Sequence, residues 1–568
     1  MGAAAAAPFF VMKVLSTFFL LLYGAVSIFA QRADVLLLNG KIWTAESAGK
    51  FVEAAAIRGE KFISTGSSLT VMKHRGPNTL VIDLKGRFAM PGINDAHSHF
   101  LSASLTTTQV DLSEASTLEQ VQAAIRKFAA ENPNAAWITG FGWQYAIFPN
   151  ARLPLKSDID AVVANRPVFL SAYDGHTGWA NSKAVEIAGV TKATEFTGFG
   201  EIVRDEAGEP TGVFKESAMR LVRSKIPAPT RDQQIEALKR GFKLAHSLGI
   251  TSIQNAHGGP GETELYAELL KSGELCLRTH IAFSVSPQTT QADIDAIAEA
   301  ARKYSSPMLR VGAVKIMVDG VVESYTAAML EPYTNKPDTM GSPSYTQEQL
   351  NNVVQRADKA GLQVFIHAIG DRGVRMALDS FEHAIRSNGR RDSRFRIEHI
   401  ETVQYDDIAR FKELGVIASM QPIHADPATI NVWADNIGAD RTSRAFAWRA
   451  IESSGIKLIF SSDFPAAISM SPWRGLHSAV NRQTINGWPA NGWLKQWSVP
   501  VSTALLAYTA NGAFASFEEA KKGKIAAGML ADLIVLDRNP FEIPSSDLHK
   551  VVVEMTIVDG KVVYEKPR

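Results

Sequence analysis

Two histidines stand one residue apart in the segment PGINDAHSH, residues 91–99. Because side chains two residues apart on a β-strand point to the same face, His97 and His99 would project together. Two neutral imidazoles placed in this way form half of a site for a divalent metal ion. Since such a pair can also be two surface histidines at a strand end, a metal site requires further ligands.

Four more residues with ligating or charged side chains occur in short apolar segments that are typical of buried strands. They are Lys315, His367, His399 and Asp463. Each lies within its segment or at the C-terminal end, and such a group is costly in an apolar strand unless it is paired or bound. Any one of them has an ordinary explanation as an ion pair or a satisfied core histidine. Five strands that carry a polar group at the same end, however, predict a metal centre.

These segments belong to a series of eight strand-like runs that alternate with helix-like stretches. One run ends at His97, and the others cover residues 249–257, 277–285, 310–320, 362–371, 395–401, 415–422 and 456–465. Residues 346–361, between two of the runs, have apolar residues at helical spacing. Eight strands close a parallel barrel whose C-terminal strand ends face the active site, so we predict an α/β fold with a TIM-like (β/α)8 barrel.

The barrel would occupy residues 89–520, with additions at both ends and one inside. Residues 32–88 and 521–568 alternate short apolar segments with hairpin-turn dipeptides such as Asp559-Gly560. We expect these two stretches to assemble into one small β-sandwich. The stretch from about 105 to 245 is too long for one connection and contains its own strands, which predicts an insertion over one rim of the barrel.

The 568-residue chain has the composition of an ordinary folded protein, with 46% hydrophobic and 21% charged residues. A formal net charge of +1, without charged blocks, argues against nucleic-acid binding. The single cysteine, Cys276, excludes both an intrachain disulfide framework and a cysteine-rich zinc site. Metal ligands must therefore come from histidine, carboxylate or modified lysine side chains.

The N-terminal region differs from the rest of the chain. Residues 14–30, VLSTFFLLLYGAVSIFA, form an uncharged apolar run, so residues 1–31 predict a signal peptide or a membrane anchor. The protein would then be directed to the endoplasmic reticulum or perinuclear membrane, or into the secretory pathway, and would contact a membrane through this segment. Cleavage after Ala30 and the orientation of an anchor are left open, as is the alternative of a buried core helix.

The motifs, taken in order, resemble a known metal centre. DAHSH, VKIMVDG, IHAIGD, IEHIE and SSDFP, which begin at residues 95, 314, 366, 397 and 461, are similar to the metal-binding segments of the amidohydrolase superfamily. The segments 173–184 and 315–333 resemble amidohydrolase family 3 in its YtcJ-like branch. The apolar N-terminal run also resembles plant members of the long-after-far-red type, which are linked to phytochrome signalling. The resemblance extends from about residue 33 to residue 565.

The resemblance implies a site for one or two divalent metal ions, and Zn²⁺ suits such ligands best. His97, His99 and Asp463 would bind the more buried ion. His367 and His399 would bind the second ion.

Lys315 requires a modification in this scheme, because an ammonium group repels a dication. The resemblance implies an N-carboxylated Lys315 whose carbamate bridges two ions, whereas in a one-metal site Lys315 would ligate nothing. Asp463 would take a proton from a metal-bound water and pass it to the leaving nitrogen. The implied reaction is hydrolysis of a non-peptide C–N bond in a small-molecule amide, formamide or cyclic amide. Asp95 matches no ligand position and is expected to bond the N–H of a histidine.

Several residues outside the ligand set could contact a substrate. The candidates are Asp174, His176, Trp179 and Asn181 in the insertion, and Asp319 and Glu323 just after Lys315. The first group would reach over the barrel mouth, or would instead form a polar turn that stabilises the insertion. Asp319 and Glu323 could likewise contact a substrate or have only a structural role.

A regulatory function is the alternative to catalysis. A membrane-associated protein in plant light signalling could keep the fold without turnover, as the resemblance to the long-after-far-red type implies. Regulatory derivatives commonly lose a ligand, whereas every expected ligand position is filled here, so we favour the enzyme. The sequence does not indicate the substrate, the oligomeric state, or whether the metal is zinc, manganese or iron.

Overall fold

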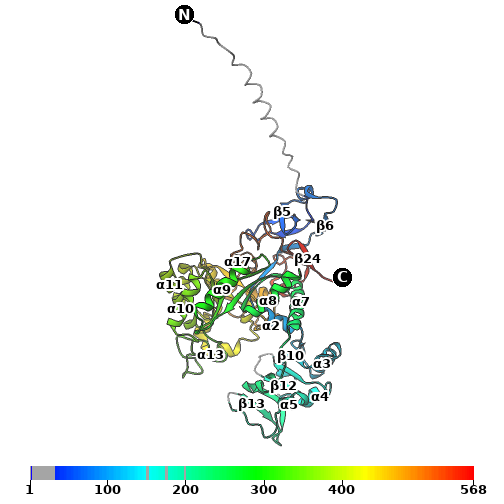
Figure 1. Ribbon diagram of the computed structural model, residues 1–568, viewed down its shortest axis with the longest axis vertical. Helices are drawn as coiled ribbons and strands as arrows, with labels where there is room; N and C mark the ends of the chain where they lie inside the picture. Colours follow the sequence, from blue (N-terminus) through cyan, green and yellow to red (C-terminus); the bar gives the residue numbers. More distant parts are fainter. Residues whose placement is uncertain (1, 3–31, 149–151, 173–176, 198–199, 568) are drawn as a thin grey trace.

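A sheet of eight parallel strands forms the centre of the molecule (Figure 1). The computed structural model describes residue 2 and residues 32–148, 152–172, 177–197 and 200–567. The strands follow one another in chain order: β8 (Ile93–Ser98), β15 (Ile250–Gly258), β16 (Arg278–Ser284), β17 (Leu309–Met317), β18 (Gln363–Ala368), β19 (Arg396–His399), β20 (Ile417–Met420) and β21 (Leu458–Phe460). The predicted barrel of eight parallel strands is therefore confirmed.

The first and last strands meet at their carboxyl ends. The Asp463 N–H donates to the carbonyl of His97 at 2.8 Å, and the His99 N–H donates to the carbonyl of Phe464 at 3.1 Å. These bonds join the segment that follows β21 to the end of β8. The closure brings together residues more than 360 positions apart in the chain, and three of them, His97, His99 and Asp463, are metal ligands predicted above.

Helices surround the sheet and bury their apolar stripes against it. The main ones are α7 (Arg231–Ser247), α8 (Pro260–Lys271), α9 (Gln291–Lys303), α10 (Gln347–Lys359), α11 (Asp371–Asn388) and α12 (Tyr405–Leu414). In α10 the buried apolar residues are Leu350, Val353, Val354 and Ala357, at the spacing of one helix face. Thr346 caps this helix by accepting the N–H of Gln349. The helix predicted at residues 346–361 is thereby confirmed.

A β-sandwich built from both chain ends lies at the amino ends of the barrel strands. One sheet contains β1 (Val35–Leu38), β4 (Ala54–Arg58), β5 (Lys61–Gly66) and β6 (Leu80–Asp83). The other contains β2 (Lys41–Trp43), β3 (Phe51–Val52), β7 (Phe88–Pro91), β22 (Leu533–Leu536), β23 (Val553–Val558) and β24 (Lys561–Glu565). The antiparallel pairing of β22 with β7 joins the two chain ends in one sheet, as the sequence predicts.

A buried ion pair attaches the sandwich to the barrel. The guanidinium of Arg278, at the start of β16, donates to Asp532 at 2.6 Å and to Asp559 at 2.9 Å. Arg278 is 1% exposed, so these carboxylates satisfy a charge that would otherwise be costly to bury.

The chain between β8 and β15 forms a lobe with its own sheet. After α2 (Phe100–Thr106) come β9 (Val110–Asp111), α3 (Leu118–Glu131), β10 (Ile138–Trp143), α4 (Lys156–Asp160), β11 (Val168–Ala172), β12 (Thr177–Ala180), α5 (Ser182–Ala188), β13 (Gly200–Arg204) and β14 (Pro210–Glu216). The sheet order is β13-β14-β12-β11-β10-β9, and Trp143 and Trp179 pack in its core. The lobe lies at the opposite end of the molecule from the sandwich (Figure 1).

The predicted targeting segment falls outside the described part of the chain. Residues 14–30 lie among those that the structure does not describe. Within the described residues, no helix combines the length and apolar character that a membrane crossing requires.

Candidate metal centre

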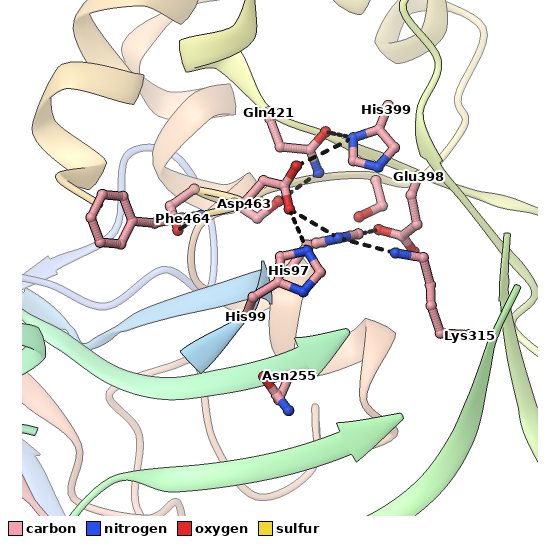
Figure 2. A network of polar contacts seen from close by, with 12 residues as sticks. His97, His99, Asn255, Lys315, Glu398, His399, Gln421, Asp463 and Phe464 are labelled. Carbon is pink, nitrogen blue, oxygen red and sulfur yellow. Dashed lines mark hydrogen bonds and ion pairs between the residues drawn. The ribbon is translucent and has the colours of Figure 1, made fainter. Parts of the chain in front are cut away.

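The carboxyl ends of four barrel strands and the segment after β21 bring the expected ligands together. They are His97 in β8, His99 directly after it, Lys315 in β17, His367 in β18, His399 at the end of β19, and Asp463. All are buried except His99, whose side chain is 25% exposed. Figure 2 shows His97, His99 and His399 around the carboxylate of Asp463. Tertiary folding thus collects polar groups that the sequence distributes over four strands and the segment after a fifth.

His97, His99 and Asp463 form one group of suitable geometry. The Nε2 atoms of His97 and His99 lie 3.3 Å and 3.0 Å from Oδ1 of Asp463. All three ligand atoms are within 4.8 Å of one another. Oδ1 is buried and has no hydrogen-bond partner among the described residues, although two ring nitrogens approach it. Two imidazole nitrogens and a carboxylate oxygen in this arrangement fit a divalent ion such as zinc.

A second group consists of His399, His424 and the same Asp463. His424 lies in η5 (Pro422–Ala425), directly after β20, and was not singled out from the sequence. Its Nε2 is 3.4 Å from Oδ2 of Asp463 without hydrogen-bond geometry, and its ring is parallel to that of His399. Although burial lowers its pKa, the carboxylates of Asp463 and Glu401 raise it to about 10. One signal was available: His424 closely follows the predicted strand 415–422.

Burial keeps most of these histidines neutral. It lowers the pKa of His99, lowers that of His367 to about 3, and lowers that of His399 well below its ordinary value. Burial also acts to raise the pKa of Asp463, but the adjacent imidazoles, His97 first among them, hold it well below its usual range. Neutral His99, His367 and His399 and an ionised Asp463 are the protonation states that metal binding requires of these residues.

Lys315 and His367 lie beside these groups. The Nζ of Lys315 is 3.3 Å from Nε2 of His97, and burial lowers the pKa of the lysine, which favours the neutral amine. The Nε2 of His367 lies 3.3 Å from the carbonyl of Gly320 and 3.6 Å from Asp319, and its ring contacts His399. Within the described chain, His367 belongs to neither three-residue group.

A buried ion pair orients His97. Its Nδ1 lies 2.6 Å from Oε2 of Glu398, and Arg396 holds both oxygens of Glu398 at 2.8 and 3.0 Å. Burial acts to raise the pKa of Glu398, but Arg396 and His97 lower it to about 2, so the carboxylate is ionised. An Nδ1–H that donates to this carboxylate leaves Nε2 free to face the centre. The sequence did not identify Glu398 because its partner is far away in the chain.

The role expected of Asp95 is corrected by the structure. Its Oδ1 accepts the Ser462 N–H at 2.9 Å, and its Oδ2 accepts the Ser462 hydroxyl at 2.5 Å. Asp95 therefore fixes the residue next to Asp463, whereas Glu398 is the carboxylate that bonds a histidine ring. Asp95 also has a hydrogen bond to the backbone of His97, so the histidine N–H that it bonds belongs to the main chain and not to an imidazole ring.

Two residues of the centre have unusual backbone conformations. His399 has φ 76° and Asp463 has φ 55°. Positive φ is rare for residues other than glycine and costs on the order of 1–3 kcal/mol at each position. Such conformations at both points where the chain leaves a strand indicate that the surrounding structure enforces the direction of these side chains.

Of the four substrate contacts predicted in the insertion, two lie outside the described residues and two are buried in the lobe. Asp174 and His176 lie outside the described residues. Trp179 is fully buried in the core of the lobe, and its Nε1–H donates to the carbonyl of Leu155 at 2.9 Å. Asn181 is also buried and caps α5. Trp179 and Asn181 therefore stabilise the lobe, which favours the structural interpretation over substrate contact.

The two candidates after Lys315 differ from each other. Asp319 is buried, and its carboxylate accepts the N–H groups of Ala328, Ile369 and Gly370 at 2.9–3.1 Å. These bonds occupy the carboxylate and favour a role in fixing the loop after β17. Glu323 is exposed on that loop.

Glu398→Gln should weaken metal binding without unfolding the protein. The amide keeps the shape of the side chain but not the charge that fixes the tautomer of His97, and such changes typically cost about 10–100-fold in metal affinity. Titration of the metal-free protein with zinc measures this loss, with Glu413→Gln on exposed α12 as the control. Equal affinities in the two variants would show that Glu398 does not orient the ligand.

Comparisons with known proteins agree with this geometry. The amidohydrolase family model matches residues 80–564. Protein LONG AFTER FAR-RED 3 of Arabidopsis thaliana is 33% identical over 94% of this chain and 92% of its own. YtcJ, an amidohydrolase-like protein of Bacillus subtilis, is 30% identical over 93% of this chain and 99% of its own. The N-substituted formamide deformylase of Arthrobacter pascens is 28% identical over 94% and 99%.

A solved structure also supports the similarity of this chain to metal-dependent hydrolases. An uncharacterized metal-dependent hydrolase from Pyrococcus furiosus is 28% identical, with a TM-score of 0.71, and the match covers 89% of this chain and 100% of that chain. The resemblance inferred from the ordered motifs, in both its YtcJ-like and its plant aspects, is thereby confirmed.

Proposed function

The chain belongs to the amidohydrolase family and is a metal-dependent hydrolase, and we propose that it cleaves the non-peptide C–N bond of a small-molecule amide, formamide or cyclic amide. The observation that carries the proposal is the buried carboxylate of Asp463, which imidazole nitrogens approach on both oxygens. The name of the Arthrobacter relative, a formamide deformylase, supports the bond type.

The residues of the centre suggest how this reaction proceeds. A divalent ion, for which zinc is our proposal, would lower the pKa of a bound water and polarise a carbonyl group. His97, His99 and Asp463 would hold it, with Glu398 fixing the tautomer of His97. The carboxylate of Asp463 takes a proton from the attacking water and delivers it to the leaving nitrogen.

A substrate screen tests the proposed bond type. Purified protein, loaded with zinc, would be incubated with N-formyl amines, N-acyl amines, cyclic amides and prolyl dipeptides, and the release of amine would be measured. We expect turnover of at least one of the non-peptide classes. Hydrolysis confined to the dipeptides would overturn the proposed bond type while leaving the hydrolase intact.

Lys315→Ala should reveal whether the lysine carries a carbamate. A lysine reacts with carbon dioxide as its neutral amine, and burial lowers the pKa of Lys315 toward that form, so we propose that Lys315 is N-carboxylated and would supply an anion that holds two ions. The variant should lose the bridging anion and most of its activity, and short carboxylic acids added to it should restore part of that activity. Carbon-13 NMR of protein supplied with labelled bicarbonate should show the carbamate. Full two-ion content with no such signal would refute the modification.

Residues 1–45 should direct a reporter to endoplasmic reticulum membranes. The apolar run at residues 14–30 is of a length that the targeting machinery binds, so we propose a location at this membrane, at the perinuclear membrane or in the secretory pathway. Fluorescence microscopy of the fusion gives the location, and a fusion that lacks residues 14–30 is the control. A diffuse cytosolic signal from the complete fusion would contradict the proposal.

A further inference from the structure

We propose that Gln254 is a positioning residue of the metal centre. It lies in β15, is 0% exposed, and acts on His97 through two intervening side chains, those of Arg396 and Glu398. The inference rests on the proposed metal-dependent hydrolase and adds to it a residue that is not itself a ligand. Through Gln254, a helix at the far end of the barrel contributes to the orientation of His97.

This helix, α17 (Ala510–Ala515), lies at the amino ends of the barrel strands. The Asn94 N–H, at the start of β8, donates to the carbonyl of Tyr508 at 2.7 Å. The side chain of Asn511 donates to the carbonyl of Leu458, at the start of β21, at 3.0 Å. The helix therefore closes the end of the barrel that is opposite to the metal centre.

The amide of Gln254 connects this helix to Arg396. Its Nε2 donates to the carbonyl of Gly512 at 2.9 Å and to Oδ1 of Asn94 at 3.2 Å, and its Oε1 accepts an N–H from Nη1 of Arg396. The opposite orientation would place the amide oxygen against a carbonyl and the amide N–H groups against a guanidinium, so the orientation is fixed. A β-carbon at position 512 would lie 3.0 Å from Asn94, so glycine permits this close approach.

The guanidinium of Arg396 is buried, with 0% exposure, and its other N–H groups are in use. Nε and Nη2 donate to the two oxygens of Glu398 at 2.8 and 3.0 Å. Nη2 also donates to the carbonyl of Ala96 at 2.8 Å and to the hydroxyl of Ser419 at 3.1 Å. Among the described residues, Gln254 is the acceptor for Nη1.

The last connection is the bond from Glu398 to His97, whose Nδ1 lies 2.6 Å from Oε2 (Figure 2). Without the oxygen of Gln254, a buried N–H of Arg396 would lose its acceptor, and such a loss is costly. The guanidinium would then shift toward another acceptor and move Glu398 with it. Because Glu398 fixes the tautomer and direction of His97, the ligand would be less well placed for the ion.

Gln363 in β18 offers a matched comparison. It is also a buried barrel glutamine, with 2% exposure, and its Nε2 donates to the carbonyl of Ala515 in α17 at 2.8 Å. The same nitrogen donates to the carbonyl of Arg394 at 2.7 Å. Both glutamines thus bind the same helix, but the hydrogen bonds of Gln363 do not continue to Glu398.

The experiment compares Gln254→Leu with Gln363→Leu in the full chain. Each metal-free protein would be titrated with zinc by calorimetry, and its thermal unfolding would be followed without metal. Both variants should unfold at a lower temperature, because each loses buried hydrogen bonds. We expect Gln254→Leu alone to weaken zinc binding, by about tenfold, the lower limit for residues that support a ligand. Gln254→Met, which fills a similar volume, replaces the leucine variant if that one does not fold.

A double-mutant cycle with Glu398→Gln distinguishes positioning from a general loss of stability. If Gln254 acts through Glu398, then Gln254→Leu should cause no further loss of zinc affinity in the Glu398→Gln protein. Independent effects would instead multiply. The unfolding temperature of the metal-free protein should still fall in both backgrounds, because the bonds to Gly512 and Asn94 are lost in each.

The outcomes separate this inference from the proposed function. Unchanged zinc affinity in Gln254→Leu, equal losses in the two glutamine variants, or multiplied losses in the double variant would each overturn the inference. In all three cases the hydrolase would stand. Failure of the unmodified protein to bind zinc would instead refute the metal centre, and this inference with it.

Discussion

Asp463→Asn should reduce hydrolysis to near background while the protein remains folded. The side chain lies at the closure of the barrel, and its oxygens face both groups of histidines. Asparagine keeps the shape and one ligating oxygen, but a neutral amide cannot take a proton from water at neutral pH. Loss of a general base alone costs about 10²–10⁴-fold in rate, and weaker metal binding should add to this.

The measurement is turnover of whichever amide proves to be a substrate, together with metal content and thermal unfolding. Asp435→Asn, an exposed change on α13 (Asn431–Ser443), is the matched control. Activity within a factor of a few of the unmodified protein would exclude Asp463 as the base.

The same variant separates an enzyme from a regulator. A folded but inactive Asp463→Asn protein that fully replaced the natural one in its organism would show that the biological role does not need turnover. Loss of function in that test would assign the role to catalysis. The distinction matters because the fold alone is compatible with both.

His97→Ala combined with His99→Ala should remove the ion of the first group and abolish activity. The double change deletes both imidazole ligands of the first group and leaves only Asp463 there. Zinc should stabilise the unmodified protein against heat, because an ion that binds only the folded state adds about 2.7 kcal/mol when its concentration is 100 times Kd. The double variant should lose most of this stabilisation.

Thermal unfolding with and without zinc, and elemental analysis of the purified proteins, provide the readouts. His383→Ala is the control, since it removes a half-buried histidine of α11 that lies outside the centre and contacts Gln355 of α10. Stoichiometric zinc in the double variant would contradict the assignment of the first group. The Glu398→Gln variant should lose an intermediate part of the stabilisation by zinc, because it disturbs only the orientation of His97.

Local patterns were sufficient to predict the barrel. A parallel strand that is buried on both faces is a continuous apolar run, so all eight could be recognised from sequence. The sandwich was recognisable for a related reason, because apolar runs and turn dipeptides at both ends of the chain require a partner to bury their faces. The barrel strands and the sandwich strands are both recognised from residues that are close together along the chain.

The residues of the centre were predicted where a polar group interrupts an apolar strand. His97 and Asp463 both show this contrast, and their common position at the carboxyl ends follows from the barrel. His424 was not predicted as a residue of the centre, because it lies after its strand in a short 3-10 helix, where a histidine does not contrast with apolar neighbours in a strand. Trp179 was predicted to contact a substrate, but its side chain is buried in the core of the lobe. The type of side chain does not reveal this direction.

The sequence by itself determined which elements form and which strand ends carry ligating groups, because these follow from local apolar periodicity and residue type. Only the tertiary structure decided which atoms meet. Glu398 reaches His97 across 301 positions, and Ser462 reaches Asp95 across 367. Such pairs form when β8 and the segment after β21 close the barrel. The partner of a buried polar group is the nearest available donor or acceptor in space, and distance along the chain does not specify it.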